Sequence, residues 1–259
     1  MANTVACFKW VVDDESIIVR DDLTVDFSRA RGKISEYDRH VLQAAAESAR
    51  VLKGISYGLT FGGADVQPAL RDSLSRGIDE VYYIADDLQK TADGAVTAKV
   101  LAATIKTIPD VALVFCAEGA SDTFARQTGP RLAACLGWPV VSSVCRFEVQ
   151  EDRVIATRLL DDVRQTVKVT FPAVLSITAE AAGAPLPSLR AIMASAKKPQ
   201  HRLELAALGL EAEALTRKTE VIASQGYKMV RKNIIFDEGS NSEKLEALLK
   251  ALIKEGILC

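Results

Sequence analysis

The sequence is poor in the residues that enzymes use for catalysis and in the patterns that most often bind phosphate. Of its 259 residues only two are histidines, and it contains no Gly-x-Gly-x-x-Gly motif and no Gly-Lys-Ser/Thr run. His40 is expected on the polar side of a helix and His201 in a surface turn, and no pair of carboxylates is placed as a general acid and base. We therefore expect no catalytic side chain.

Several classes of protein are excluded by what the chain has little of. Its 32 basic and 34 acidic residues nearly cancel, which gives no basic surface for nucleic acid. No apolar run approaches the roughly 18 residues of a membrane span, and the N-terminus lacks the pattern of a signal peptide. The five cysteines form no C-x-x-C pair, so we expect reduced thiols, no bound metal and a cytoplasmic protein without membrane insertion. They are Cys7, Cys116, Cys135, Cys145 and Cys259.

What is present is an alternation of apolar strands and helical patterns. Helices are expected at 34–54, where Gly54 is placed to end the helix, at 64–77, at 91–108 and at about 124–136. Strands are expected at 4–12, 55–63, 80–85 and 111–119, all apolar enough to be covered on both faces. This alternation predicts an α/β fold with a Rossmann-like, doubly wound and mostly parallel sheet of the adenine-nucleotide-binding type.

The pattern changes after residue 136. Segments 139–149, 153–160, 165–171 and 173–178 read as strands without helices between them, so we expect antiparallel additions or a mixed edge. We assign residues 1–200 to the core domain and 201–259 to a C-terminal arm. Ser240 to Glu243 forms a capping box for a last helix, which ends at Gly256. That helix carries an apolar stripe of Leu245, Leu248, Leu249 and Leu252.

Three segments are expected at the carboxyl edge of the sheet, where open α/β sheets bind ligands. They are residues 7–10, 61–63 and the loop "AEGASDTFARQTGP" at 117–130. Asp65 is placed to cap the second helix, and Ser121 or Asp122 to cap the helix after the loop. The exposed amides of that loop form either a site for an anion or a simple helix cap. The residues alone predict a nucleotide-sized crevice without hydrolytic chemistry.

Several motifs occurring in order resemble the beta subunit of electron transfer flavoproteins, particularly its FixA-like branch. They are "VACFKWVVDD", "KISEYDRHVLQAAAE", "LTFGGADVQPALRDSLSRGIDEVYYI", "AEGASDTFARQTGPRLAACLGWPVV" and "PAVLSITAEAAGAPLPSLRAIMASAKKP", which together span about the first 200 residues. The resemblance implies a heterodimer whose alpha subunit carries FAD, while the beta subunit's own pocket holds AMP or, in electron-bifurcating members, a second FAD. Carried over by position, the pocket residues are Cys7, Ser35, Phe61, Ala117, Ser121, Asp122, Arg126, Gln127 and Thr128.

This chain departs from the family pattern at some of these positions. Ser35 stands where Asn is frequent, Arg126 replaces an Asn or another polar residue, and the Asp-Gly-Asp-Thr run of many relatives is absent. AMP and FAD therefore both stay open, although the bifurcating members of the FixA-like branch favour FAD by analogy.

The resemblance also implies a docking loop, "AGAPLPSLRAIM", that presents Leu189 to a flavin dehydrogenase such as an acyl-CoA dehydrogenase. The usual Asn-x-Pro-Arg before it reads Ala-Gly-Ala-Pro here. An exposed leucine on a proline-stiffened loop is suited to act as a binding hot spot. The alternative is that Leu189 begins a short helix and packs inward.

Two other classes of function compete with an electron carrier. A non-redox nucleotide-binding regulatory protein of similar fold accounts for the crevice, but it does not account for the four late strands or the leucine-striped arm. An ATP-using ligase or sulfurtransferase requires a pyrophosphate loop of the Ser-Gly-Gly-x-Asp-Ser type near the first strand, and the sequence has none. The electron carrier is the hypothesis that covers most of the chain.

Overall fold

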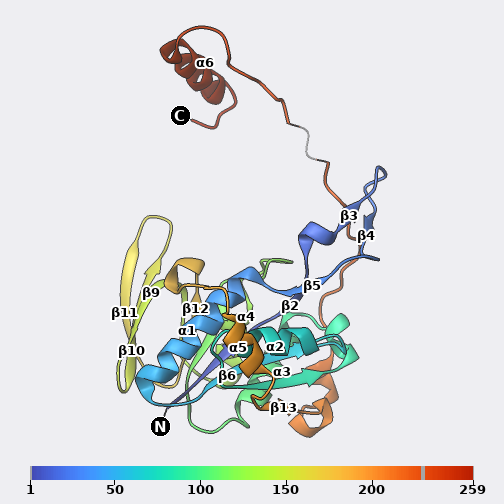
Figure 1. Ribbon diagram of the computed structural model, residues 1–259, viewed down its shortest axis with the longest axis vertical. Coiled ribbons are helices and arrows are strands. Elements are labelled where there is room, and N and C mark those ends of the chain that lie inside the picture. Colours follow the sequence, from blue (N-terminus) through green and yellow to red (C-terminus); the bar gives the residue numbers. More distant parts are fainter. Residues whose placement is uncertain (1, 229–230, 259) are drawn as a thin grey trace.

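The computed structural model describes residues 2–228 and 231–258, and a nine-stranded mixed sheet forms its body (Figure 1). The strand order is β11-β10-β9-β12-β8-β1-β6-β7-β13. Six neighbouring pairs are parallel, and the pairs β9–β10 and β10–β11 are antiparallel. The central strands are β1 (Asn3–Cys7), β6 (Ser56–Gly62), β7 (Glu80–Ala85), β8 (Val111–Ala117) and β12 (Ala173–Ile177).

Helices cover both faces of this sheet. Helices α1 (Glu36–Leu52) and α2 (Gln67–Ser75) pack on one face, while α3 (Gly94–Ile105) and α4 (Thr128–Leu136) pack on the other. On β8 the side chains alternate between the two cores: Leu113 and Phe115 face α1, whereas Val114 and Cys116 face α3 and α4. The predicted doubly wound α/β fold is therefore confirmed.

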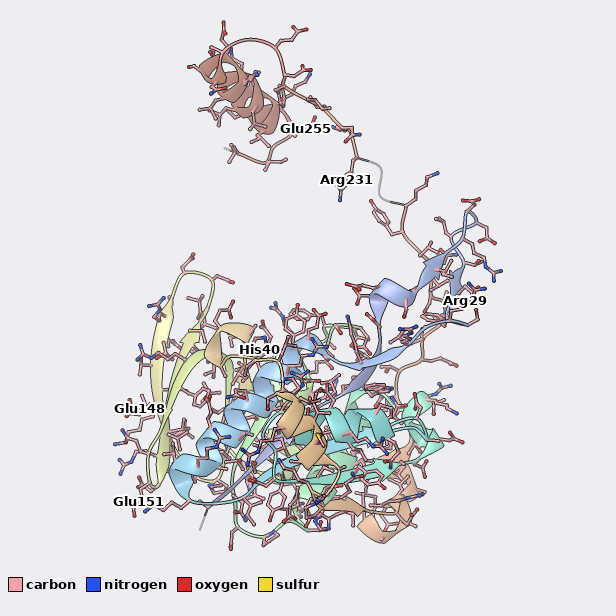
Figure 2. The ribbon with its side chains drawn as sticks, viewed as in Figure 1. Arg29, His40, Glu148, Glu151, Arg231 and Glu255 are labelled. Atoms are coloured by element: carbon pink, nitrogen blue, oxygen red, sulfur yellow. The ribbon has the colours of Figure 1, made fainter. Side chains whose placement is uncertain are left out.

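The prediction of one strand over residues 4–12 was wrong. The chain leaves the sheet after Cys7, and β2 (Trp10–Val12) pairs antiparallel with β5 (Gly32–Ile34). Between them, β3 (Ile18–Val19) and β4 (Val25–Asp26) form a hairpin that projects from the body (Figure 1), and Arg29 lies just beyond it (Figure 2). The Trp10 indole lies directly over Gly32, where an added Cβ would come within 2.2 Å of the ring. Only glycine fits beneath it.

The mixed edge of the sheet is confirmed for two of the four late strands. β10 (Arg153–Leu159) and β11 (Arg164–Thr170) are antiparallel to their neighbours and form an outer ribbon. β9 (Val140–Val149) instead runs parallel to β12, which itself runs parallel to β8. The parallel core thus extends further than the lack of intervening helices suggested.

The end of the chain has two parts. A short edge strand, β13 (Gln200–Arg202), pairs with β7, and two 3-10 helices, η4 (Leu205–Leu208) and η5 (Ala212–Leu215), pack against the α3 side. The surface turn expected at His201 was wrong, because this residue lies on β13, stacks on Tyr82 and places Nε2 2.7 Å from the Glu80 carboxylate. The second part, helix α6 (Asn241–Lys254), stands apart from the body in Figure 1.

The described residues can be compared with two expectations from the sequence, reduced cysteines and no membrane-spanning helix. Cys7, Cys116, Cys135 and Cys145 are free thiols, and Cys259 lies outside the described residues. Within residues 2–228 and 231–258, no helix has the length and apolar content that a membrane crossing requires.

Candidate functional site

The topology singles out one place on the carboxyl edge of the sheet. From β1 the chain continues to β6 and β7 on one side, and it then returns to β8 on the other side of β1. β1 and β8 are hydrogen-bonded neighbours, and their carboxyl ends are Cys7 and Ala117. The segments that follow these two strands therefore flank the topological switch point, where open α/β sheets form their ligand crevice.

The loop after β8 is longer than its sequence suggested. Helix α4 begins at Thr128 with Gln127 as its N-cap residue, so the helix predicted from about residue 124 starts one turn later. The predicted caps were wrong: neither Ser121 nor Asp122 caps α4, and Val66 rather than Asp65 is the N-cap residue of α2. The loop at 118–127 instead crosses the switch point in an irregular conformation.

Two contacts join this loop to the segment after β1. The Ser121 amide donates a hydrogen bond to Ser35 Oγ at 3.2 Å. Ser35 is the N-cap residue of α1, and its hydroxyl makes no cap bond to that helix. The Lys9 ammonium group forms an ion pair with the Asp122 carboxylate at 2.5 Å. The structure thus brings together three of the predicted site residues, Ser35, Ser121 and Asp122, and adds Lys9.

Arg126 and Phe124 shape the outer wall of the loop. Both have positive φ angles, 57° and 45°, which non-glycine residues rarely adopt. The Arg126 guanidinium lies over the Phe124 ring at 4.7 Å from its centroid, and the Phe124 ring packs against Tyr37 of α1 at 5.1 Å. Arg126 Nε is 3.9 Å from the Glu118 carboxylate and its side chain is largely exposed. Its charge is therefore available to a ligand at the edge of the sheet.

Three of the predicted residues belong to the floor of the site. Cys7, Phe61 and Ala117 are buried at the ends of β1, β6 and β8. Cys7 and Phe61 face the apolar core under α3 and α4. A hydrogen bond with Cys116, together with burial, raises the pKa of the Cys7 thiol well above its ordinary value. These side chains provide shape and not charge, so any polar contact there comes from the backbone.

Gln127 and Thr128 lie where the loop enters α4, and both are exposed. The Gln127 side-chain oxygen accepts a hydrogen bond from Arg131 Nε at 2.9 Å. Behind them, Gly129 lies so close to β12 that an added Cβ would be 3.1 Å from the Ser176 side chain. The close approach holds the beginning of α4 against the sheet, beside the switch point.

Sequence reasoning missed the residue that organises the segment after β1. Asp38 on α1 is buried, and its carboxylate accepts a hydrogen bond from the Lys9 amide at 2.8 Å. Burial raises the pKa of Asp38 to about 7. The signal was in the pattern, since Asp38 lies three residues after the Ser35 cap position, on the buried face of a helix where a lone carboxyl group is unusual.

The residue predicted to dock a partner lies elsewhere. Leu189 is the first residue of α5 (Leu189–Ser195), so it does begin a short helix. It nevertheless points outward and is 74% exposed, beside Leu186 at 87% and Met193 at 70%. The alternative in which Leu189 packs inward is therefore wrong, while its role in docking stays a prediction.

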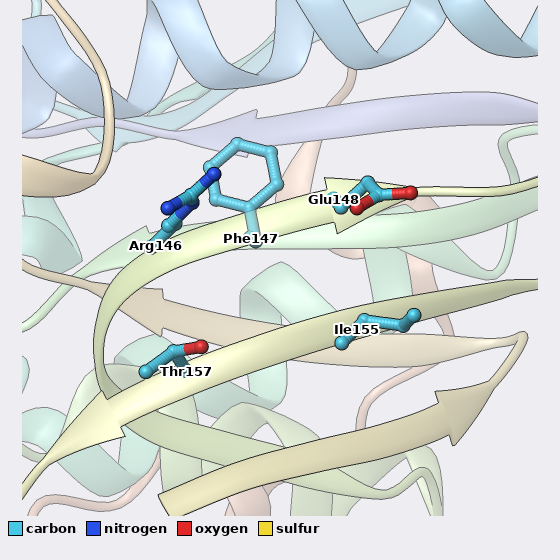
Figure 3. A pocket seen from close by; sticks show the side chains of 5 residues that line it. All are labelled: Arg146, Phe147, Glu148, Ile155 and Thr157. Carbon is cyan, nitrogen blue, oxygen red and sulfur yellow. The ribbon is translucent and has the colours of Figure 1, made fainter. Parts of the chain in front are cut away.

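A surface hollow lies away from all of these residues. Figure 3 shows it on the pair β9 and β10, lined by three residues of β9 and two of β10. They are Arg146, Phe147, Glu148, Ile155 and Thr157. None is a predicted site residue, and one of the five, Glu148, is labelled in Figure 2.

A comparison with protein families identifies the family of the chain. The family model described as electron transfer flavoprotein domain matches residues 22–208, which is more than half of the 259-residue chain. The matched region contains α1, β8 and the loop at 118–127, together with α5. Proteins with this domain are electron carriers. The chain belongs to the electron transfer flavoprotein family.

Proposed function

We propose that this chain is the beta subunit of a heterodimeric electron transfer flavoprotein of the FixA-like branch, and that it binds an adenine nucleotide at the switch point. It passes electrons between a flavin dehydrogenase and an acceptor. The observation that carries the proposal is the convergence of Lys9, Ser35 and the loop at 118–127 on the carboxyl edge between β1 and β8. Flavin supplies the redox chemistry, and the protein supplies position and electrostatics.

The residues at this edge fit a phosphorylated ligand. The Ser35 hydroxyl does not cap α1, so the first amides of that helix have no side-chain acceptor. Lys9 and Arg126 bring two cations to the same loop, and hydroxyls of Ser35 and Thr128 flank it. Amides, hydroxyls and basic side chains are the groups that bind phosphate without cleaving it.

The heterodimer partner is an alpha subunit that carries the FAD used for electron transfer. Two exposed apolar surfaces offer separate places for this subunit and for the dehydrogenase. The leucine stripe of α6 is uncovered, with Leu245 58% exposed, and the apolar surface of Leu186, Leu189 and Met193 is separate from it. We assign the first to the alpha subunit and the second to the dehydrogenase, because each is an apolar patch on an otherwise polar segment.

The nucleotide content of the purified heterodimer tests the proposal. The chain is co-expressed with the alpha-subunit gene, and FAD and AMP are counted per heterodimer after denaturation. One FAD and one AMP identify a simple carrier, while two FAD and no AMP identify a bifurcating member. A colourless chain that copurifies with no second subunit would contradict the proposal.

A further inference from the structure

The backbone of Lys9 is anchored by two hydrogen bonds, although the residue lies in a connecting segment at the surface. It lies between β1 and β2, and its amide donates to the buried Asp38 carboxylate at 2.8 Å. Its carbonyl oxygen accepts the Ser35 amide at 3.1 Å. Both backbone groups of Lys9 are therefore tied to the start of α1. Its backbone is therefore fixed beside the switch point, and its side chain extends to Asp122 in the loop after β8.

The partner that Lys9 has in this structure holds it only weakly. The Lys9 and Asp122 side chains are 40% and 31% exposed, and ion pairs that water reaches contribute about 0–1 kcal/mol to stability. Asp122 also has a second partner, because its Oδ1 atom accepts the Thr123 amide at 2.8 Å. The ion pair can therefore open without leaving the carboxylate unsatisfied.

The same ion pair fixes where the loop lies. Lys9 binds Asp122, and the adjacent Ser121 amide binds Ser35 Oγ, so two successive loop residues are attached to the segment around Lys9 and α1. A phosphate that reaches the switch point meets the Lys9 ammonium group together with the Asp122 carboxylate that is bound to it. Like charges repel, so the phosphate and Asp122 compete for one ammonium group.

We propose that Lys9 is a phosphate-binding residue of this site and that Asp122 is its exchangeable counterion, which a nucleotide phosphate displaces when it binds. The inference rests on the proposed nucleotide site and adds to it a residue pair that sets affinity. In the exchange no covalent bond forms or breaks. One ion pair replaces another, and the loop at 118–127 loses one of its two attachments.

The test compares AMP with adenosine, which lacks the phosphate and leaves the rest of the ligand unchanged. Both are titrated calorimetrically into the purified heterodimer after its bound nucleotide has been removed. Lys9→Met is expected to weaken AMP at least tenfold and to change adenosine less than twofold. Lys9→Arg, which keeps the charge, is expected to restore most of the AMP affinity. Asp122→Asn is expected to tighten AMP three- to tenfold without affecting adenosine.

Each other outcome has a distinct meaning. Equal losses for AMP and adenosine in Lys9→Met, or no loss for either, would overturn the role of Lys9. Weaker AMP binding in Asp122→Asn would overturn the counterion role. Because Asp122 is exposed, its substitution should leave the fold intact, so this variant remains a test if Lys9→Met does not fold. If the unaltered heterodimer binds FAD but not AMP, the same losses must appear for FAD. If it binds neither, the nucleotide site itself is wrong, and the inference is overturned with it.

Discussion

The sheet body and helix α6 use the same kind of apolar pattern with opposite results. In the body, apolar positions of α1 and α3 are covered by strands of the same chain, and Leu42 and Val100 are fully buried. In α6 an equally regular leucine stripe has no buried residue at all. Its capping box is formed and its helix is complete. The local sequence is therefore sufficient to form this helix. Burial of its leucine stripe requires a second surface.

The difference separates two sources of stability. Helices of this length gain most of their stability from packing an apolar face and little from intrinsic propensity. The apolar faces of the body helices pack on strands of the same chain. In our proposal the leucine stripe of α6 packs on the alpha subunit. Four experiments test this difference, and they are ordered by the size of the expected effect.

The largest effect is expected from matched truncations in the two regions. Phe115 is fully buried on β8 and its ring packs 5.4 Å from that of Phe147, so Phe115→Ala should cost about 3–5 kcal/mol. Leu249→Ala in α6 should change the unfolding free energy of the isolated chain by less than about 0.5 kcal/mol. Urea denaturation measures both. A similar loss for the two variants would show that α6 packs on the body in solution.

The next effect concerns pH and is confined to the body. The pKa of Asp38 is about 7 in the folded chain and about 4 when unfolded, so between these values the folded state binds more protons. Stability from this group is therefore fully present below pH 4 and is lost as pH rises to 7, by about 1.4 kcal/mol per unit at most.

Asp38→Asn should abolish this slope, because an amide does not titrate and its oxygen still accepts the Lys9 amide. Unfolding free energies at pH 5, 6, 7 and 8 measure the effect. The Lys9 charge lowers the pKa of Asp38 and the Asp122 charge raises it, so Asp122→Asn, which keeps the buried carboxyl group, should retain the slope and move it to lower pH. Parallel pH profiles for the unaltered chain and Asp38→Asn would contradict the assignment.

Removing α6 should affect assembly and leave the body unchanged. A chain ending at Lys228 keeps Leu203, Leu208 and Leu215, which pack against the α3 side of the sheet. We expect its thermal midpoint to stay the same and its affinity for the alpha subunit to fall about 100-fold or more, since several leucine side chains lose their cover. Association is measured by analytical ultracentrifugation. Undiminished affinity would mean that α6 does not bind the alpha subunit.

The smallest effect is expected at α5. Leu189→Ala should weaken electron delivery from the dehydrogenase about five- to tenfold at limiting partner concentration, because a truncated hot spot costs more than about 1 kcal/mol. Flavin content should be unchanged. Val51→Ala, which shortens a 60% exposed side chain on α1, is the matched control. Equal transfer rates for Leu189→Ala and the unaltered protein would exclude Leu189 as an anchor.

Sequence alone predicted the central elements well, because their apolar periodicity is strong and local. The strands at β6, β7 and β8 and the helices α1 and α3 lie where the patterns placed them. The missed features depend on pairing between distant segments. "TVACFKWVV" is apolar apart from Thr4 and Lys9, and its pattern does not show that Trp10 pairs with Ile34 outside the main sheet. His201 was missed for the same reason, since β13 exists only by pairing with β7.

The candidate site was predicted in outline and not in its contacts. The alternation of elements predicts a doubly wound sheet with the Ser121 loop at its carboxyl edge, and the family resemblance added Ser35, so both residues were expected there. The link between them was not, because a 3.2 Å hydrogen bond spans 86 residues of chain. The capping prediction at Asp122 failed because the loop at 118–127 makes tertiary contacts and takes its conformation from them and not from local preference.

The packing of Trp10 over Gly32 places an intrinsic fluorophore, the indole ring, beside the candidate site. The chain has two tryptophans, and the other, Trp138, packs against the α3 and α4 side of the sheet. Replacing Trp138 with Phe leaves Trp10 as the single indole fluorophore, covalently adjacent to Lys9. Emission from that ring then follows the segment after β1 directly, so ligand exchange at the switch point becomes visible in real time without any attached dye.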